Sequence, residues 1–345
     1  LPTIETGMYP HHTGVFSEWA AIELDKDIIT IAERARDMGY STASLMGDGI
    51  GIYNGVTRGY DRLIVSPYRT FAYEGVERTI RYLEGCGEAD HFIFLHMNDV
   101  HPWSGELFQI SSSAQMQLSL AGRLSASKGR VPSPYLRPSA FYHAAFWQAV
   151  HDTDRALGAL FSYIEKHYAP EDYLISLYSD HGVPIFSPTP YIVDTHLTRA
   201  TWMMRGAEVP EGIVADELTS AVDIYPTLAH LLDFSVDANV DGVLPQLFEG
   251  TGREIAFSNS LYPRKEYHLA ARTQEYTLCL ETMDVVSVSG TANLERTKVG
   301  IYPRAHEREA GFALDNAELR SFFYPRVREF LKGIGNNGEL FPLPE

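Results

Sequence analysis

The 345-residue chain has little cysteine and no long apolar run, and each absence excludes a class of protein. Its two cysteines, Cys86 and Cys279, are far apart and fit neither a disulfide framework nor a zinc cluster. No apolar segment is long enough to span a bilayer, and no Asn-x-Ser/Thr acceptor for glycosylation occurs. Positive charge is also scarce, since 45 acidic residues against 28 Lys and Arg give a formal net charge of −17. This charge argues against nucleic acid or an anionic membrane as a partner.

The start of the chain leaves its compartment open. The sequence begins at Leu1, without a methionine and inside what resembles a motif, so we expect an upstream segment. No signal peptide is visible, and both a cytoplasmic and a periplasmic location stay open. The oligomeric state cannot be read from the sequence either.

What the chain does contain is an alternation of helical and strand-like patterns. The helices are expected at residues 27–38, 74–83, 146–164 and 223–232, and the strands at 40–46, 91–97, 173–178 and 202–204. This alternation predicts an α/β fold with a mostly parallel central sheet flanked by helices. Residues 109–138, rich in Ser, Gly and Pro, are expected to cross the surface as a long loop, which could serve as a lid.

The character of the sequence changes after about residue 250. Short strands without helices between them are expected at 255–258, 267–272, 276–281 and 285–288, followed by a helix over 319–331 with a kink at Pro325. The pattern predicts a small antiparallel sheet with a helix on it. We therefore expect a catalytic α/β domain over residues 1–250 and a smaller α+β subdomain over 251–345.

The most informative stretch is Ser179-Asp180-His181-Gly182, directly after the apolar run 173–178. The run predicts a buried parallel strand, and open α/β sheets bind ligands at the carboxyl ends of such strands. An Asp oxygen beside a His nitrogen suits a divalent ion such as Zn, Mn, Mg or Ca. The alternative is a strand-to-turn junction, in which Asp180 accepts local backbone hydrogens and Gly182 supplies a positive φ.

Six segments, in order, carry a resemblance to a known family. They are residues 5–14 ("TG-x-YP-H…G"), 31–43 ("LAE…GY-x-TA"), 59–61 ("GFD"), 96–103 ("H-x-x-D-P-H-x-P"), 178–182 ("(T/Y)SDHG"), and 223–228 with 241–242 ("D-x-x-PTL…DG"). In this order they resemble the sulfatase family of the alkaline phosphatase superfamily. A small C-terminal sheet domain is also what this resemblance implies.

The resemblance implies metal-dependent hydrolysis of a small anionic sulfate ester. Asp180 and His181 would be metal ligands, and the identity of the ion, Ca, Mg, Mn or Zn, stays open. His101 would contact the sulfuryl oxygens or the leaving oxygen; alternatively it is a loop histidine held rigid beside Pro102. A bound cation acts as a Lewis acid, while a nearby imidazole protonates the departing alkoxide.

The sequence also departs from the family pattern. The nucleophile, a formylglycine or a plain Ser or Thr, would fall just before Leu1, and the paired N-terminal aspartates would lie further upstream. The lysines that usually grip sulfate have no match, because none occurs in residues 45–54 or between Lys166 and Lys265. His196 lies where one such lysine is expected and would be a substrate contact or an additional metal ligand; alternatively it is a plain loop histidine.

These departures keep other functions open. A phosphodiesterase, a phosphonate monoester hydrolase or a phosphoethanolamine-type transferase of the same superfamily would fit the Asp-His pair and the missing lysines. A catalytically inactive member that keeps the fold as a binding module is a further alternative. The substrate itself cannot be read from the sequence.

Overall fold

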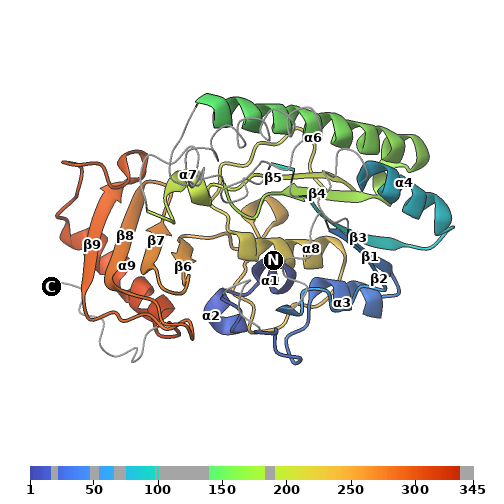
Figure 1. The fold of residues 1–345 in the computed structure, drawn as a ribbon. Helices are drawn as coiled ribbons and strands as arrows, with labels where there is room; N and C mark the ends of the chain where they lie inside the picture. Colours follow the sequence, from blue (N-terminus) through green and yellow to red (C-terminus); the bar gives the residue numbers. More distant parts are fainter. Residues whose placement is uncertain are drawn as a thin grey trace, which may run out of the picture.

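The computed structural model describes residues 1–16, 22–46, 54–65, 75–97, 99–100, 140–182 and 191–334, with backbone alone at 140–145. An α/β part and a smaller antiparallel sheet lie side by side (Figure 1). The expected α/β fold, with a parallel central sheet and a small C-terminal antiparallel sheet plus helix, is therefore confirmed. The division of the chain at residue 250 stays a prediction.

The parallel sheet has the strand order β2-β1-β3 in the described part of the chain. Its strands are β1 (Ser41–Met46), β2 (Arg62–Val65) and β3 (His91–His96). Met46 pairs with His96, so β1 and β3 end level at their carboxyl ends. Strand β2 was not predicted, because an exposed arginine opens it and only four residues pair with β1.

A second pair of strands carries the Ser-Asp-His-Gly motif. Strand β4 (Leu174–Tyr178) runs antiparallel to β5 (Trp202–Gly206), whereas the sequence predicted a parallel strand here. The reversal occurs where Ser179 N–H donates to Thr201 O and Thr201 N–H donates to Ser179 Oγ, both at 2.9 Å. These bonds hold the start of β5 beside the end of β4, as an antiparallel pair requires.

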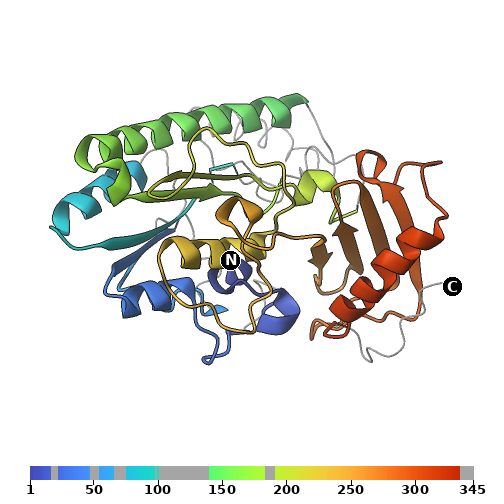
Figure 2. The same cartoon turned by 180° about the vertical axis from the view of Figure 1, so that it is seen from behind.

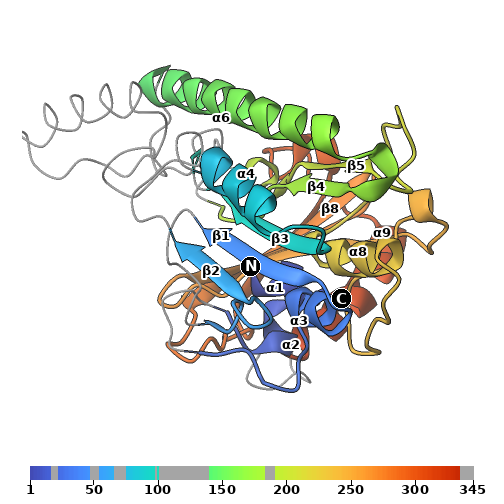
Figure 3. The same cartoon turned by 90° about the vertical axis from the view of Figure 1, so that its right-hand side faces the viewer.

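Helices cover both sides of the strands. Figure 3 shows α4 (Val76–Gly85) and α6 (Ala140–His167) on one side, and α1, α3 (Ile31–Asp37) and α8 (Ile224–Leu231) on the other. Helix α3 begins later than predicted because Thr30 and Glu33 form a capping box, in which each side chain accepts the other's backbone N–H.

The N-terminal residues contain two short helices. They are α1 (Pro2–Thr6) and α2 (Pro10–Thr13), and each begins at a proline and ends before a glycine with positive φ. Proline presets the φ of a first helical position and glycine tolerates the left-handed C-terminal one, which explains both boundaries. Gly7 O accepts the N–H groups of Asp241 and Gly242 and so fastens α1 to the chain after α8.

The C-terminal sheet is antiparallel in the order β6-β7-β8-β9. Its strands are β6 (Ala256–Ser260), β7 (Glu266–Arg272), β8 (Tyr276–Val285) and β9 (Thr297–Pro303). The two expected strands 276–281 and 285–288 are replaced by the longer β8, while β9 was not predicted. Short 3₁₀ turns cover Pro170–Asp172, Ala221–Asp223, Gln246–Phe248 and Arg304–His306.

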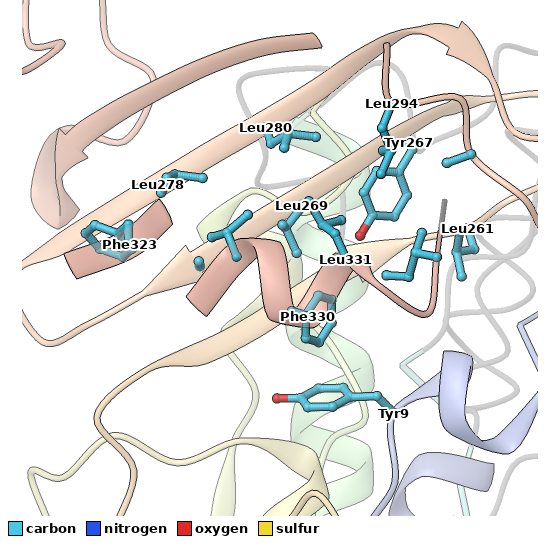
Figure 4. Close-up of a cluster of buried hydrophobic side chains, with 14 of the residues drawn as sticks. Tyr9, Leu261, Tyr267, Leu269, Leu278, Leu280, Leu294, Phe323, Phe330 and Leu331 are labelled. Carbon is cyan, nitrogen blue, oxygen red and sulfur yellow. The ribbon is translucent and has the colours of Figure 1, made fainter. Parts of the chain in front are cut away.

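Helix α9 (Ala317–Leu331) lies across this sheet (Figure 2) and continues through Pro325. Its apolar residues pack on buried sheet residues such as Leu269, Leu278 and Leu280 (Figure 4). Tyr9 joins the same cluster from the N-terminal part, with its ring centroid 5.0 Å from that of Phe330. One apolar core therefore connects the C-terminal sheet to the start of the chain.

Candidate functional site

Asp180 and His181 form a mixed oxygen and nitrogen corner just after β4. Asp180 Oδ1 accepts the His181 backbone N–H at 2.9 Å, and Asp180 Oδ2 lies 3.6 Å from His181 Nε2. Both side chains are about half exposed, at 50% and 47%. The hydrogen bond expected for a strand-to-turn junction is thus present. It engages Asp180 Oδ1 and leaves Asp180 Oδ2 beside the His181 imidazole.

The ring of His181 is oriented by the main chain. Its Nδ1 lies 2.6 Å from Gly182 O, and because a carbonyl oxygen only accepts, Nδ1 carries the hydrogen. The Nε2 lone pair then faces the same side as Asp180 Oδ2. A backbone carbonyl that fixes the tautomer in this way is the usual support of a metal-binding histidine, so the donor set fits a divalent cation.

Asp180 is held in its ionised form. Partial desolvation by the surrounding protein opposes its ionisation, but the charges of His181 and His96, together with the His181 N–H, lower the pKa of Asp180 below its ordinary value. The carboxylate is therefore charged at neutral pH, as cation binding requires.

His96 is a member of this site to which the sequence analysis assigned no role. It is the last residue of β3, its ring stacks on Phe94 with the centroids 6.4 Å apart, and its charge acts on Asp180. The signal that could have found it is its position at the carboxyl end of a parallel strand, where such folds place ligand contacts.

His196 lies next to the same turn, on the short helix α7 (Thr195–Thr198). Gly182 N–H donates to Leu197 O at 2.8 Å, and a methyl group on Gly182 would lie 2.0 Å from His196 O. Gly182 is thus needed for close approach, and not for the positive φ that the turn interpretation expected. The His196 side chain is half exposed, and its Nδ1 lies 3.4 Å from Asp194 Oδ1.

The C-terminal sheet holds the segment that carries His196. Arg272 of β7 donates to Val193 O at 2.6 Å, and Glu307 accepts a hydrogen bond from the Thr195 hydroxyl at 3.0 Å. The Arg272 and Glu307 side chains, 6% and 8% exposed, are joined by an ion pair of 2.6 Å. A buried arginine–carboxylate pair therefore positions α7 beside Asp180 and His181.

A family model described as "Sulfatase" matches residues 1–234. The chain belongs to the sulfatase family. A sequence comparison with curated proteins finds no match.

Solved structures show the same fold in other proteins, at low identity. A Bacteroides thetaiotaomicron protein from work on glycosaminoglycan metabolism is 17% identical, with a TM-score of 0.70, and the match covers 96% of this chain and 83% of that one. A phosphonate monoester hydrolase from Silicibacter pomeroyi is 14% identical, with a TM-score of 0.68 and coverage of 97% and 85%. A protein solved with its substrate D-glucosamine-2-N,6-O-disulfate is 16% identical, with a TM-score of 0.64 and coverage of 96% and 86%.

Some predicted features of this sulfatase-family chain lie outside the described residues. These are His101 and the long loop 109–138. Within the described ranges, no group of three or more His, Cys, Asp and Glu side chains forms a complete metal-binding cluster. Among the same residues, no helix is both long and apolar enough to cross a lipid bilayer.

Two residues in the family motifs are held by contacts with residues far along the chain. The ring of His11 packs edge-on against Phe330, with the centroids 4.7 Å apart. Asp223 forms a capping box with Ser220 at the 3₁₀ turn before α8, and its carboxylate also binds the Arg253 guanidinium and accepts the Val243 N–H at 2.8 Å. No local pattern indicates the contacts with Phe330, Arg253 and Val243.

Glu5 in α1 is a buried carboxyl group near the site. It is 2% exposed, its Oε1 accepts the Tyr60 hydroxyl at 2.9 Å, and its Oε2 has no hydrogen-bond partner within the described part of the protein. Burial raises the pKa of Glu5 to about 7, although the hydrogen bond from Tyr60 acts in the opposite direction. Burial, and then the charges of Glu5 and Asp180, raise the pKa of Tyr178, so both carboxyl groups lie close to the end of β4.

The stability of the protein is expected to fall as the pH rises from 4.5 to about 7. The unfolded carboxyl group loses its proton above 4.5 while native Glu5 keeps it to about 7, so the native state binds more protons in this range. The shift corresponds to about 3 kcal/mol of unfolding free energy. In urea unfolding at both pH values, Glu5→Gln should lose this pH-dependent part, whereas the exposed Glu88→Gln should keep it. Equal pH dependence in Glu5→Gln and the wild type would contradict the assignment.

Gly182→Ala is expected to displace α7 from the Asp180 turn. The added methyl group would meet His196 O at 2.0 Å, so the unfolding free energy should fall by about 1–3 kcal/mol. Gly158→Ala in α6 is the matched control, because nothing lies within 4 Å of its methyl group and alanine favours the helix. Calorimetric melting of the two variants measures the difference, and similar melting temperatures would show that α7 does not depend on Gly182.

Proposed function

We propose that this protein hydrolyses sulfate esters, with a divalent cation held by Asp180 and His181. The observation that supports this most directly is the ionised carboxylate beside a tautomer-fixed imidazole at the end of β4. Membership of the sulfatase family supports a hydrolase, and the geometry supplies the residues that would do the work.

In this proposal, some residues bind the ester and another transfers a proton. When bound, the cation would draw electron density from the sulfuryl oxygens and favour an ionised nucleophile. Asp180 and His181 would hold it. His196 contacts the sulfuryl oxygens in place of a lysine, and His101 holds the proton that the departing alkoxide oxygen takes up.

We place the nucleophile and the remaining carboxylate ligands upstream of Leu1. Glu5 of α1 and Asp180 both act electrostatically on Tyr178, so α1 lies near the end of β4, which supports this position. A Cys or Ser converted to formylglycine there would fit sulfate ester hydrolysis.

A phosphonate or phosphodiester hydrolase is the second candidate. The Asp-His pair and the absence of lysine between Lys166 and Lys265 favour it, and a phosphonate monoester hydrolase has a similar fold. A plain Ser or Thr before Leu1 would fit this activity.

The natural full-length gene product should be assayed with 4-nitrophenyl sulfate, phenyl 4-nitrophenylphosphonate and D-glucosamine-2-N,6-O-disulfate. Its metal content should be measured in parallel, before and after treatment with EDTA. Sulfate release that is lost with EDTA and restored by a divalent ion supports the first candidate, while cleavage of the phosphonate alone supports the second. A protein with no stoichiometric divalent ion and no activity on any of the three would contradict both and indicate an inactive family member.

A further inference from the structure

A hollow lined by three arginines lies at the edge of the parallel sheet, away from the residues of the candidate site. It has a volume of about 280 Å³ and is lined by Arg62 and Ile64 of β2 and by Arg78, Arg81 and Tyr82 of α4. Its described lining includes neither the Asp-His corner nor α7.

Sequence spacing places the lining residues of each element on one face of that element. Arg62 and Ile64 are two residues apart on β2 and therefore point to the same face of the sheet. Arg78 lies three and four residues before Arg81 and Tyr82, so these three share one face of α4.

The floor and one wall of the hollow are fixed by packing. Tyr82 is 5% exposed, its hydroxyl lies 3.2 Å from Ser41 Oγ, and the Arg62 guanidinium stands over its ring at 5.5 Å from the centroid. Tyr82 also packs with Ala43 of β1. The hollow is therefore built on the core of the sheet.

The local charge of the hollow is opposite to that of the protein. The whole chain carries −17, yet three of its 28 basic residues line one small hollow. Glu77 forms an ion pair of 2.6 Å with Arg81 and reduces the positive charge there. Three like charges around a small volume repel each other, and a bound anion relieves that repulsion.

We propose that this hollow binds a tetrahedral oxyanion group, such as a sulfate or phosphate group, at a place separate from the candidate active site. Guanidinium groups present paired N–H donors that match two oxygens of such a group, which makes arginine well suited to this task. Ile64 and the Tyr82 ring offer an apolar surface to whatever carries the group.

Size and charge limit the ligand to a compact anion. Salt screens charges over about 8 Å under physiological conditions, so a small site can be positive within an acidic protein. A long polyanion that spreads over the surface would meet a protein whose formal net charge is −17. A single group, free or on a small molecule, would contact the lining of the hollow alone.

The binding of sodium sulfate, sodium phosphate and a sulfated disaccharide should be measured by calorimetry in low-salt buffer. Arg62→Gln and Arg78→Gln should each weaken binding about tenfold, as the loss of one charge-assisted contact predicts. Glu77→Gln should tighten it, because the competing carboxylate is removed. Arg205→Gln is the matched control. Arg205 is an exposed residue of β5 that pairs with Glu165 of α6, and this variant should bind the anions as the wild type does.

The comparison with Asp180→Asn separates this proposal from the proposed function. Binding in the hollow should persist in Asp180→Asn, and hydrolysis of 4-nitrophenyl sulfate should persist in Arg62→Gln. If the disaccharide binds more tightly than sulfate, the ligand is a group carried by a saccharide. If the two bind equally, the ligand is a free ion. Wild-type anion binding in both arginine variants, with melting temperatures unchanged, would overturn the proposal whether or not the protein is a hydrolase.

Discussion

Asp180→Asn is expected to abolish stoichiometric divalent-ion binding and to slow ester hydrolysis by about 10²–10³-fold. The substitution keeps an oxygen that can accept the His181 N–H, so the turn should form as before. It removes the negative charge that the surrounding groups hold in its ionised form. A Lewis-acid contact is worth several kcal/mol to the transition state, which corresponds to this loss of rate.

Metal analysis and steady-state kinetics on the full-length protein measure both effects. Asp172→Asn is the matched control, because Asp172 is an exposed aspartate just before the same strand. The control should keep its metal and its activity. Wild-type metal content in Asp180→Asn would contradict the assignment of Asp180 as a ligand, even if the activity fell.

Arg272→Met is expected to destabilise the protein by about 3–5 kcal/mol. The change leaves the Glu307 carboxylate buried without its guanidinium partner, and an uncompensated buried charge is among the costliest defects in a fold. It also removes the hydrogen bond to Val193 O that holds the segment before α7. Chemical denaturation measures the first effect, and the KM for the ester measures the displacement of His196.

The double variant Arg272→Met with Glu307→Met provides the control. Replacing both partners of a buried ion pair by apolar residues is often close to neutral, so the double variant should recover most of the lost stability. It should not recover the KM, because the bonds to Val193 O and to the Thr195 hydroxyl stay absent. Additive losses of stability in the double variant would show that the pair is not what stabilises this region.

Local signals in the sequence predicted several elements correctly, because each depends on neighbours in the chain. The apolar run 173–178 forms β4. The apolar periodicity of the sequence predicted helices α4, α6, α8 and α9. Helix boundaries differ from the predicted ones where a proline, a glycine or a capping residue determines the end of the helix. The short strands β2 and β9 lacked such a run and were missed.

The sequence by itself determined the family, the α/β class and the Asp-His pair, since ordered motifs and short-range patterns carry that information. Only the tertiary structure decided that His96 and the α7 segment meet the Asp180 turn, that Glu5 is buried near it, and that three arginines share one hollow. Most of these contacts join segments that are distant in the sequence, such as Glu5 and the end of β4. Their proximity depends on how strands pair and helices pack, and on the burial that follows, which no local pattern encodes.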